Sequence, residues 1–207
     1  FQDGIYELED LYIRRKGQKL DIDFNFDSRS YDYRTSLIGS IKPDDYNKLL
    51  PQWWASIFRD FDFNHKGTIL SDFIIYGNAR SKLADLYYGR ARANNIRYKD
   101  VIVDESDLIV RGRYGYTELK GLKVACGHGW ASGDIAFVSK PDKIRAPVSV
   151  RLDMEAKLSL DDAAKLSPEN IAPIISNFKT NEPTLFCLKG TISVSYTHLT
   201  LPTTSKV

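Results

Sequence analysis

Apolar and polar residues alternate strictly between positions 19 and 27. The apolar positions are Leu20, Ile22, Phe24 and Phe26. The polar positions between them are Asp21, Asp23, Asn25 and Asp27. Because successive side chains of a β-strand point to opposite faces, this pattern predicts a strand with one dry face and one wet face. The alternation resumes at Tyr31, Tyr33, Leu37 and Ile41 after the polar run 27–30, so we expect a β-hairpin.

The next segment, 43–59, has helical character. Pro43-Asp44-Asp45 is typical of a first helical turn, where proline is tolerated and acids meet the positive end of the helix dipole. Pro51 interrupts the segment, and 52–59 predicts a second short helix. We therefore expect a helical hairpin inserted between strands.

Strands return after Phe61. Apolar residues occupy both odd-numbered and even-numbered positions of 69–76, which predicts a central strand covered on both faces. Further strands are expected over 86–98, 101–111, 116–124 and 130–138, with glycines at the turns, and a connection is expected over 141–147. The sequence thus predicts a mainly β protein: a long curved antiparallel sheet with short helical hairpins inserted between sheet units.

An internal repeat divides this sheet. The run Asp44-Asp45 to Pro51 aligns with Asp161-Asp162 to Pro168 at a spacing of 117 residues. Gly67-Thr-Ile aligns with Gly190-Thr-Ile further on. We expect a first unit over 1–140 and the start of a second, truncated unit over 141–193.

Both ends of the chain look like breaks. Residues 1–8 already have the pattern of a strand in progress. The run 194–203 resembles the translation of a transposon adapter from a sequencing library. We expect 194–207 to be a non-native tail, with a natural start upstream of Phe1.

Charge and hydropathy exclude two classes of partner contact for the residues present. The net charge is +2, and no Lys/Arg cluster with interleaved aromatics is present, so nucleic acid is not an expected partner. No run approaches the roughly 20 apolar residues of a membrane-spanning helix.

Candidate chemistry is sparse. Asp60-x-Asp62-x-Asn64 has the first ligands of a calcium loop, but Ser71 stands where the closing glutamate belongs. Asp104, Glu105 and Asp107 form an acidic cluster without a histidine or nucleophile beside them, so a solvated strand end is the better interpretation. His65 and His128 lie apart, and Cys126 and Cys187 lack metal or redox spacing and are expected to be small buried hydrophobes. We predict no catalytic residue, no metal and no cofactor.

Three patches carry a family resemblance. Residues 67–77, 89–98 and 129–137 resemble AsmA-like, TamB-related proteins, and the last of these segments has the family's recurrent ending of glycine, strand and Gly-x-Ile. The resemblance implies a repeating β-groove in the periplasm, anchored to the inner membrane by an N-terminal helix that this sequence lacks. It further implies phospholipid or another acyl-chain lipid as partner, in lipid transport or outer-membrane assembly, and no catalytic residues.

The residues expected to line such a groove share one predicted face. They are Leu20, Ile22, Phe24, Phe26, Leu37, Phe73 and Ile75. The same pattern fits a closed sandwich core covered by a second sheet, so open groove and closed core both remain at this point. A surface adhesion or glycan-binding repeat protein is the other class, with Tyr31, Tyr33, Tyr87 and Tyr88 as exposed stacking platforms.

Overall fold

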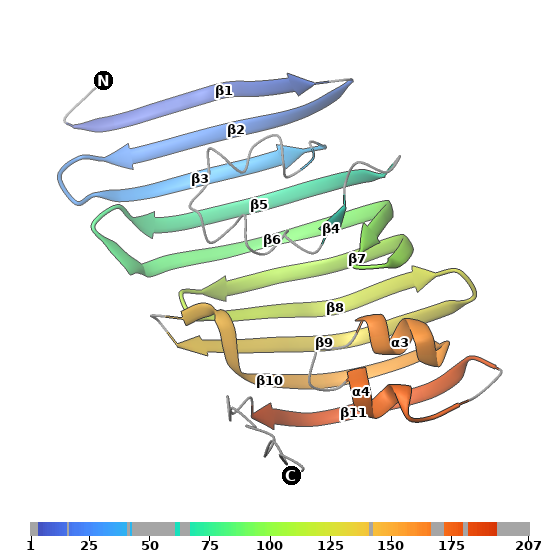
Figure 1. Cartoon of the computed structure of the whole chain (residues 1–207). Helices are drawn as coiled ribbons and strands as arrows, with labels where there is room; N and C mark the ends of the chain where they lie inside the picture. Colours follow the sequence, from blue (N-terminus) through green and yellow to red (C-terminus); the bar gives the residue numbers. More distant parts are fainter. Residues whose placement is uncertain are drawn as a thin grey trace, which may run out of the picture.

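The computed structural model describes residues 4–15, 17–40, 42, 61–62, 67–140, 143–166, 172–179 and 182–193. They form one antiparallel sheet of eleven strands with two short helices (Figure 1). The strands are β1 (Ile5–Arg15), β2 (Gln18–Asp27), β3 (Asp32–Gly39), β4 (Phe61–Asp62), β5 (Thr68–Asn78), β6 (Ser81–Tyr98), β7 (Val101–Arg113), β8 (Tyr116–Cys126), β9 (Gly129–Lys140), β10 (Lys143–Leu158) and β11 (Thr184–Ser193). The helices are α3 (Leu160–Leu166) and α4 (Ala172–Ser176). The predicted long antiparallel sheet is confirmed.

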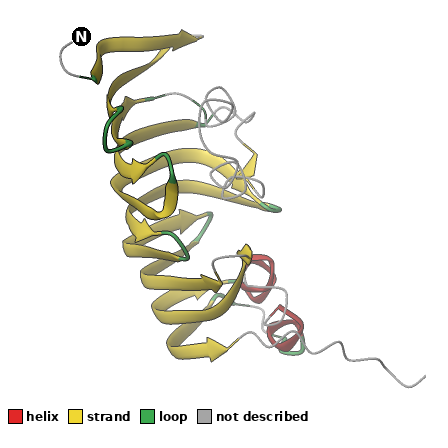
Figure 2. Ribbon diagram, turned by 90° about the vertical axis from the view of Figure 1, so that its left-hand side faces the viewer, coloured by secondary structure: helices red, strands yellow, loops and turns green. Residues whose placement is uncertain are grey.

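The sheet is an open meander. Strand order follows the chain from β1 to β11, except that the two-residue β4 pairs with the last residues of β6, beyond the first residue of β5. The outermost strands β1 and β11 lie at opposite edges and do not meet, and the sheet twists along its length (Figures 1 and 2). The described residues contain this single sheet and no second one packed against it.

The pairing register brings the buried apolar side chains of neighbouring strands onto one face of the sheet. Ile22 lies opposite Leu37, Leu37 opposite Phe73, and Ile75 opposite Tyr87. We call this the apolar face, and its members across the sheet include Leu20, Ile22, Leu37, Phe73, Ile75, Tyr87, Val110, Leu119, Ile135, Leu152 and Leu188. The reverse side, the charged face, includes Asp21, Arg34, Asp72, Arg90, Asp107, Lys120, Asp134, Asp153 and Lys189.

The helices cover one end of the apolar face. Ala163 of α3 is buried with Val101, Cys126, Ala156 and Leu158, and Ile175 of α4 packs against the same cluster. Figure 2 shows both helices on one side of the sheet. This covered end comprises β7 to β11, because those strands supply the sheet residues of the cluster.

The start of α3 agrees with the acidic helix start predicted for Asp161-Asp162. The Asp162 amide donates to Ser159 Oγ at 3.1 Å, and Ser159 Oγ donates to the Asp162 carboxylate at 2.8 Å. This reciprocal cap satisfies one of the amides that a helix start leaves without a partner. Lys165 pairs with Asp161 one turn earlier on the exposed side of the helix.

Two strand predictions are corrected by the structure. β5 is central but buried on one face only, and Leu70 on its charged face is 51% exposed. The connection expected over 141–147 is wrong from Lys143 onward, because β10 begins there with a register shift at Pro147. A proline is tolerated in a strand at such an irregularity, where its missing N–H breaks no ladder bond.

Only part of the predicted repeat lies within the described residues. Helices α3 and α4 lie between the neighbouring strands β10 and β11, whereas the matching segment 43–59, between β3 and β5 in the chain, lies outside the described residues. Gly67 precedes β5, but Gly190 lies inside β11. The repeat, the domain division at 140–141 and the non-native tail 194–207 therefore stay predictions.

Leu20 provides a test of the core on the apolar face. It is 1% exposed, so Leu20→Ala should lower the free energy of unfolding by about 2–5 kcal/mol through lost transfer energy and a cavity. Leu70→Ala, on the charged face of β5, should change it by less than about 0.5 kcal/mol. Urea unfolding monitored by circular dichroism measures both, and equal effects would contradict the assignment of faces.

Candidate functional site

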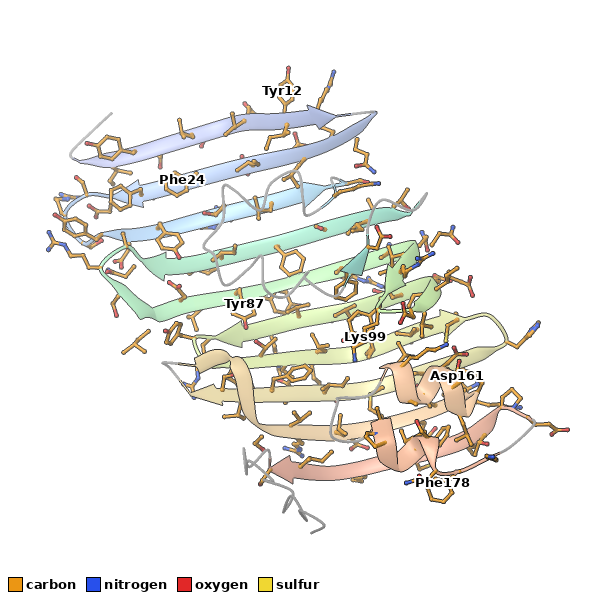
Figure 3. All side chains as sticks on the ribbon, viewed as in Figure 1. Tyr12, Phe24, Tyr87, Lys99, Asp161 and Phe178 are labelled. Carbon is orange, nitrogen blue, oxygen red and sulfur yellow. The ribbon has the colours of Figure 1, made fainter. Side chains whose placement is uncertain are left out.

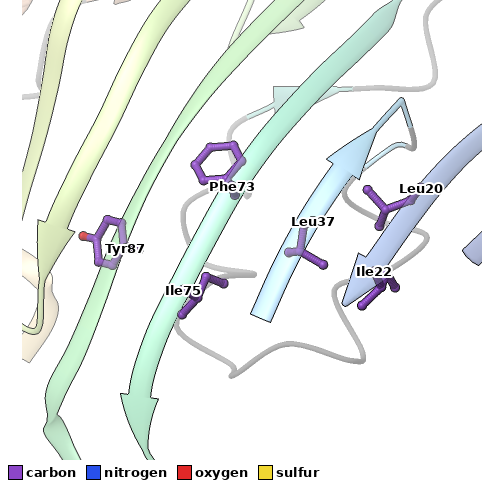
Figure 4. Close-up of a cluster of buried hydrophobic side chains, with 6 residues drawn as sticks. All are labelled: Leu20, Ile22, Leu37, Phe73, Ile75 and Tyr87. Atoms are coloured by element: carbon purple, nitrogen blue, oxygen red, sulfur yellow. The ribbon is translucent and has the colours of Figure 1, made fainter. Parts of the chain in front are cut away.

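The predicted groove residues fall into two groups on the apolar face. Five of them are buried together in one cluster with Tyr87: Leu20, Ile22, Leu37, Phe73 and Ile75 (Figure 4). Gly89 lies opposite Phe73, and a Cβ at Gly89 would come within 2.5 Å of the Phe73 ring, so glycine provides the space for that ring. These five residues form core in this structure.

The other two predicted residues, Phe24 and Phe26, line an apolar hollow at the β1–β2 end of the sheet. The hollow has a volume of about 490 Å³ and is lined by Ile5, Tyr6, Glu7, Leu8, Phe24, Phe26 and Ser28. The Phe24 and Phe26 rings stack at 6.5 Å, and Tyr6 lies tilted against Phe26 at 6.1 Å. The Glu7 carboxylate accepts a hydrogen bond of 2.8 Å from Asn25 of the charged face. The open surface that this hollow presents is therefore largely hydrocarbon.

Sequence reasoning missed the contribution of β1 to this hollow. Tyr6 and Leu8 lie opposite Phe26 and Phe24, and Leu11 lies opposite Ile22, so all three belong to the apolar face. Tyr6 and Leu8 have even numbers and Leu11 has an odd number, because a bulge separates Leu8 from Leu11, with Asp10 at φ 58°. Such a bulge adds one residue and restores the same face afterwards. Leu8 is 55% exposed, which marks the uncovered end of the apolar face.

A buried polar contact lies at one margin of the core. The Tyr33 hydroxyl donates to Asp85 Oδ1 at 3.1 Å, and Asp85 is buried although it is an acid. Burial, and then the neighbouring Asp85 carboxylate, raise the pKa of Tyr33 well above its usual range. Tyr87 makes a comparable contact, because its hydroxyl pairs with Thr117 and donates to the Tyr116 carbonyl at 3.3 Å. Burial raises the pKa of Tyr87 as well, against the opposing effect of Thr117.

Opposite charges pair across neighbouring strands on the charged face. Arg90 of β6 bonds Asp107 of β7 at 2.8 Å, and Arg111 of β7 bonds Glu118 of β8 at 2.7 Å. Lys120 of β8 pairs with Asp134 of β9. Hydrogen bonds from these cations, as the first cause, lower the pKa values of Asp107, Glu118 and Asp134. Exposed pairs of this kind contribute little each, about 0–1 kcal/mol, but they assign this face to water.

The tyrosines proposed as exposed stacking platforms are not a single surface. Tyr87 is 4% exposed and Tyr33 is half-buried, because both have the parity of the apolar face. Tyr88 is 57% exposed on the charged face. Tyr31 lies in the β2–β3 turn under the Arg80 guanidinium, whose carbon is 3.3 Å from the ring centroid. The expectation of four exposed tyrosines is therefore wrong for Tyr31, Tyr33 and Tyr87, since Tyr31 is half-buried as well.

The remaining chemical candidates lie apart from one another. Asp104 accepts a hydrogen bond from the Gly127 amide and Asp107 belongs to the charge pairs, whereas Asp60 and Asn64 lie outside the described residues. Across the described ranges, no three His, Cys, Asp or Glu residues come together as metal ligands. Cys126 is buried as predicted, and burial raises the pKa of its thiol, but Cys187 is exposed, contrary to expectation. Cys187 has the parity of the charged face of β11, which explains its exposure.

Comparisons of the chain with protein-family models, with curated proteins and with solved structures find no match. None of the helices in the described ranges has the length and apolarity that a bilayer crossing requires. The geometry of the apolar face is therefore the evidence on which a function can rest.

The contact between Tyr33 and Asp85 yields a stability prediction. Tyr33→Phe should lower the free energy of unfolding by about 1–3 kcal/mol, because it removes one donor from a buried carboxyl group. Tyr88→Phe removes an exposed hydroxyl of the same type and should be nearly neutral.

The contribution of Tyr33 should also depend on pH. Since the folded state raises the pKa of Tyr33, its protonated form is favoured in the fold. The contribution should be complete below the unfolded pKa of about 10 and decline as pH rises further. Urea unfolding of both variants at neutral and alkaline pH measures this, and equal stability of the two variants would contradict it.

Proposed function

We propose that this chain is a non-catalytic piece of a periplasmic β-groove that takes part in phospholipid transport or outer-membrane assembly. The acyl chain of the lipid lies along the apolar face and enters the hollow at the β1–β2 end. The observation that carries this proposal is the continuous apolar face, covered by helices over β7 to β11 and hollowed beside Phe24 and Phe26.

The composition of the hollow favours an acyl chain over a headgroup. Phe24, Phe26, Tyr6 and Leu8 supply aromatic and aliphatic surface, and the lining residues include no cation that could bind a phosphate. Burying an acyl chain gains about 0.8 kcal/mol per CH₂, so a chain can be held without specific polar contacts. Such contacts are also weak enough individually for a chain to slide.

The open architecture supports movement of the lipid along the sheet. The apolar face continues through neighbouring strands by register, with Phe26 opposite Tyr33 and Phe24 opposite Thr35. A hydrocarbon chain at the hollow therefore meets the half-buried Tyr33 and Thr35 next, before the buried cluster around Leu37. The resemblance of residues 67–77, 89–98 and 129–137 to AsmA-like proteins supports the same function, and with it the periplasm and an inner-membrane anchor outside this sequence.

Replacement of the two phenylalanines tests this proposal. Phe24→Asp combined with Phe26→Asp should reduce co-purifying phospholipid at least about tenfold. A tenfold change in affinity corresponds to about 1.4 kcal/mol, which the lost burial of two CH₂ groups, at about 0.8 kcal/mol each, already exceeds. Both side chains are partly exposed, so far-UV circular dichroism should show unchanged β content. Detergent-free mass spectrometry of the purified protein counts the bound lipid.

The matched control makes the same chemical change on the other face. Leu86→Asp combined with Tyr88→Asp places two acids on the charged face of β6, where both native side chains are exposed, and should leave bound lipid unchanged. Lipid that persists in the Phe24 and Phe26 variant would contradict the proposal. So would an equal loss of lipid from both double variants.

A further inference from the structure

A cluster of large, exposed side chains lies on the charged face of the two central strands β5 and β6. Tyr76 of β5 is 47% exposed, and Leu86 and Tyr88 of β6 are 52% and 57% exposed. Tyr76 lies opposite Leu86, and the half-buried Ile74 lies opposite Tyr88, so these four side chains are neighbours. Figure 3 shows Tyr87, which stands between Leu86 and Tyr88 in the sequence, in the interior of the sheet. Exposed apolar side chains that gather in this way are typical of a contact surface.

Two arginines frame this cluster. The register runs from Arg34 of β3 through Tyr76 and Leu86 to Arg113 of β7, in one row across four strands. Both arginines are exposed, and neither forms an ion pair within the described ranges. The Arg34 guanidinium lies over the Tyr76 ring, with its carbon 6.0 Å from the ring centroid. We call the following set the tyrosine–arginine patch: Arg34, Ile74, Tyr76, Leu86, Tyr88 and Arg113.

The cations of this patch differ from the other cations of the charged face. Arg111, next to the patch on β7, is held by Glu118, and Arg90 is held by Asp107. Asp23 of β2 lies diagonally across from Arg34 but does not pair with it. The patch therefore has two positive charges at its ends and apolar surface between them. Its complement is a partner with two acids on either side of an apolar group.

We propose that the tyrosine–arginine patch binds an extended acidic segment of another protein, in which two carboxylates flank one apolar side chain. Neighbouring strands are about 4.8 Å apart, so three strand spacings separate Arg34 from Arg113 by about 14 Å. An extended chain advances about 3.4 Å per residue with alternating side chains, so acids four residues apart span that distance and point the same way. The apolar side chain midway between them then lies over Tyr76 and Leu86. Four residues of a helix advance only about 6 Å, which is too short.

The same contacts favour a protein partner over two other occupants. A sugar ring would stack on an open aromatic face, but Arg34 already lies over the Tyr76 ring. A second copy of this chain presents the same two arginines, so pairing of two patches would bring like charges together. Tyrosine and arginine are the residues enriched where proteins contact other proteins. The patch lies on the opposite face from the hollow at Phe24 and Phe26, so this proposal does not depend on the proposed function.

Binding of short peptides to the whole chain tests the proposal. The probe is the fluorescein-labelled peptide Gly-Glu-Thr-Leu-Thr-Glu-Gly, and fluorescence anisotropy measures its dissociation constant. It should bind at least about tenfold more tightly than the same peptide with lysine in place of both glutamates. It should bind about threefold more tightly than a peptide with the two glutamates only two residues apart. Both comparisons use the unchanged protein, so they hold even if a variant fails to fold.

A charge exchange locates the binding on the protein. Arg34→Glu combined with Arg113→Glu should weaken binding of the acidic peptide at least about tenfold and strengthen binding of the lysine peptide by a similar factor. The matched control, Arg151→Glu combined with Lys157→Glu, makes the same change of net charge at exposed positions of β10. It lies more than a Debye length from the patch, so it should change either affinity by less than about twofold. Circular dichroism checks the fold of both double variants.

Several results would overturn the proposal. They are an absence of saturable binding of the acidic peptide, equal binding of the acidic and lysine peptides, and an equal loss of binding in both double variants. Tighter binding of an oligogalacturonate than of the acidic peptide would assign the patch to an anionic glycan instead. A dimer in sedimentation velocity that the Arg34 and Arg113 variant loses would assign it to a second copy. Bound lipid should stay unchanged in every variant, which separates a failure here from a failure of the proposed function.

Discussion

The two-residue period of the β-strand is the constraint on which the rest of the structure depends, because a slip of one residue moves every side chain to the other face. Ten long strands satisfy it together, and the bulges show how. In β1 the apolar face passes from Leu8 to Leu11, and in β8 it passes from Leu119 to Leu122. Gly121 adopts φ 57° at the second of these sites, a conformation that glycine reaches without strain. At each bulge the apolar face passes from even-numbered to odd-numbered residues or the reverse, and the apolar side chains stay on the same side of the sheet.

A sheet with one dry face has to bury that face or expose it, and this chain does both. At one end of β7 to β11 the short helices α3 and α4 cover the apolar face through Ala163 and Ile175. At the β1–β2 end the face forms a hollow beside Phe24 and Phe26. The charged face is exposed and carries cross-strand pairs of acids and bases, together with exposed apolar side chains such as Leu70 and Leu86. The difference between these ends is what makes the apolar face a candidate binding surface and not only a core.

The sequence pattern was sufficient to predict the strands up to β9 and the shared face of Leu20, Ile22, Leu37 and Phe73, but it placed a connection where β10 begins. Alternation could not tell which of Tyr87 and Tyr88 is buried. The two residues are identical and adjacent, and only the pairing register decides which of them lies on the apolar face. Alternation also missed Tyr6 and Leu8, whose parity is disconnected from Leu11 by the bulge at Asp10. The contact between Tyr33 and Asp85 joins β3 to β6 and has no local signal at all. Alternation identifies the apolar face of a strand but not whether other parts of the chain cover it. The sequence could therefore not show that five of the seven predicted groove residues are buried in the core.

Photo-crosslinking with a diazirine-bearing fatty acid tests most directly whether the apolar face receives a hydrocarbon chain. The reagent labels whatever side chain the acyl chain touches, and peptide mass spectrometry locates the label. The account predicts labelling on β1 and β2 at Tyr6, Leu8, Phe24 and Phe26, with Leu86 and Tyr88 of the charged face unlabelled. Labelling concentrated on Leu86 and Tyr88, or spread equally over both faces, would contradict it.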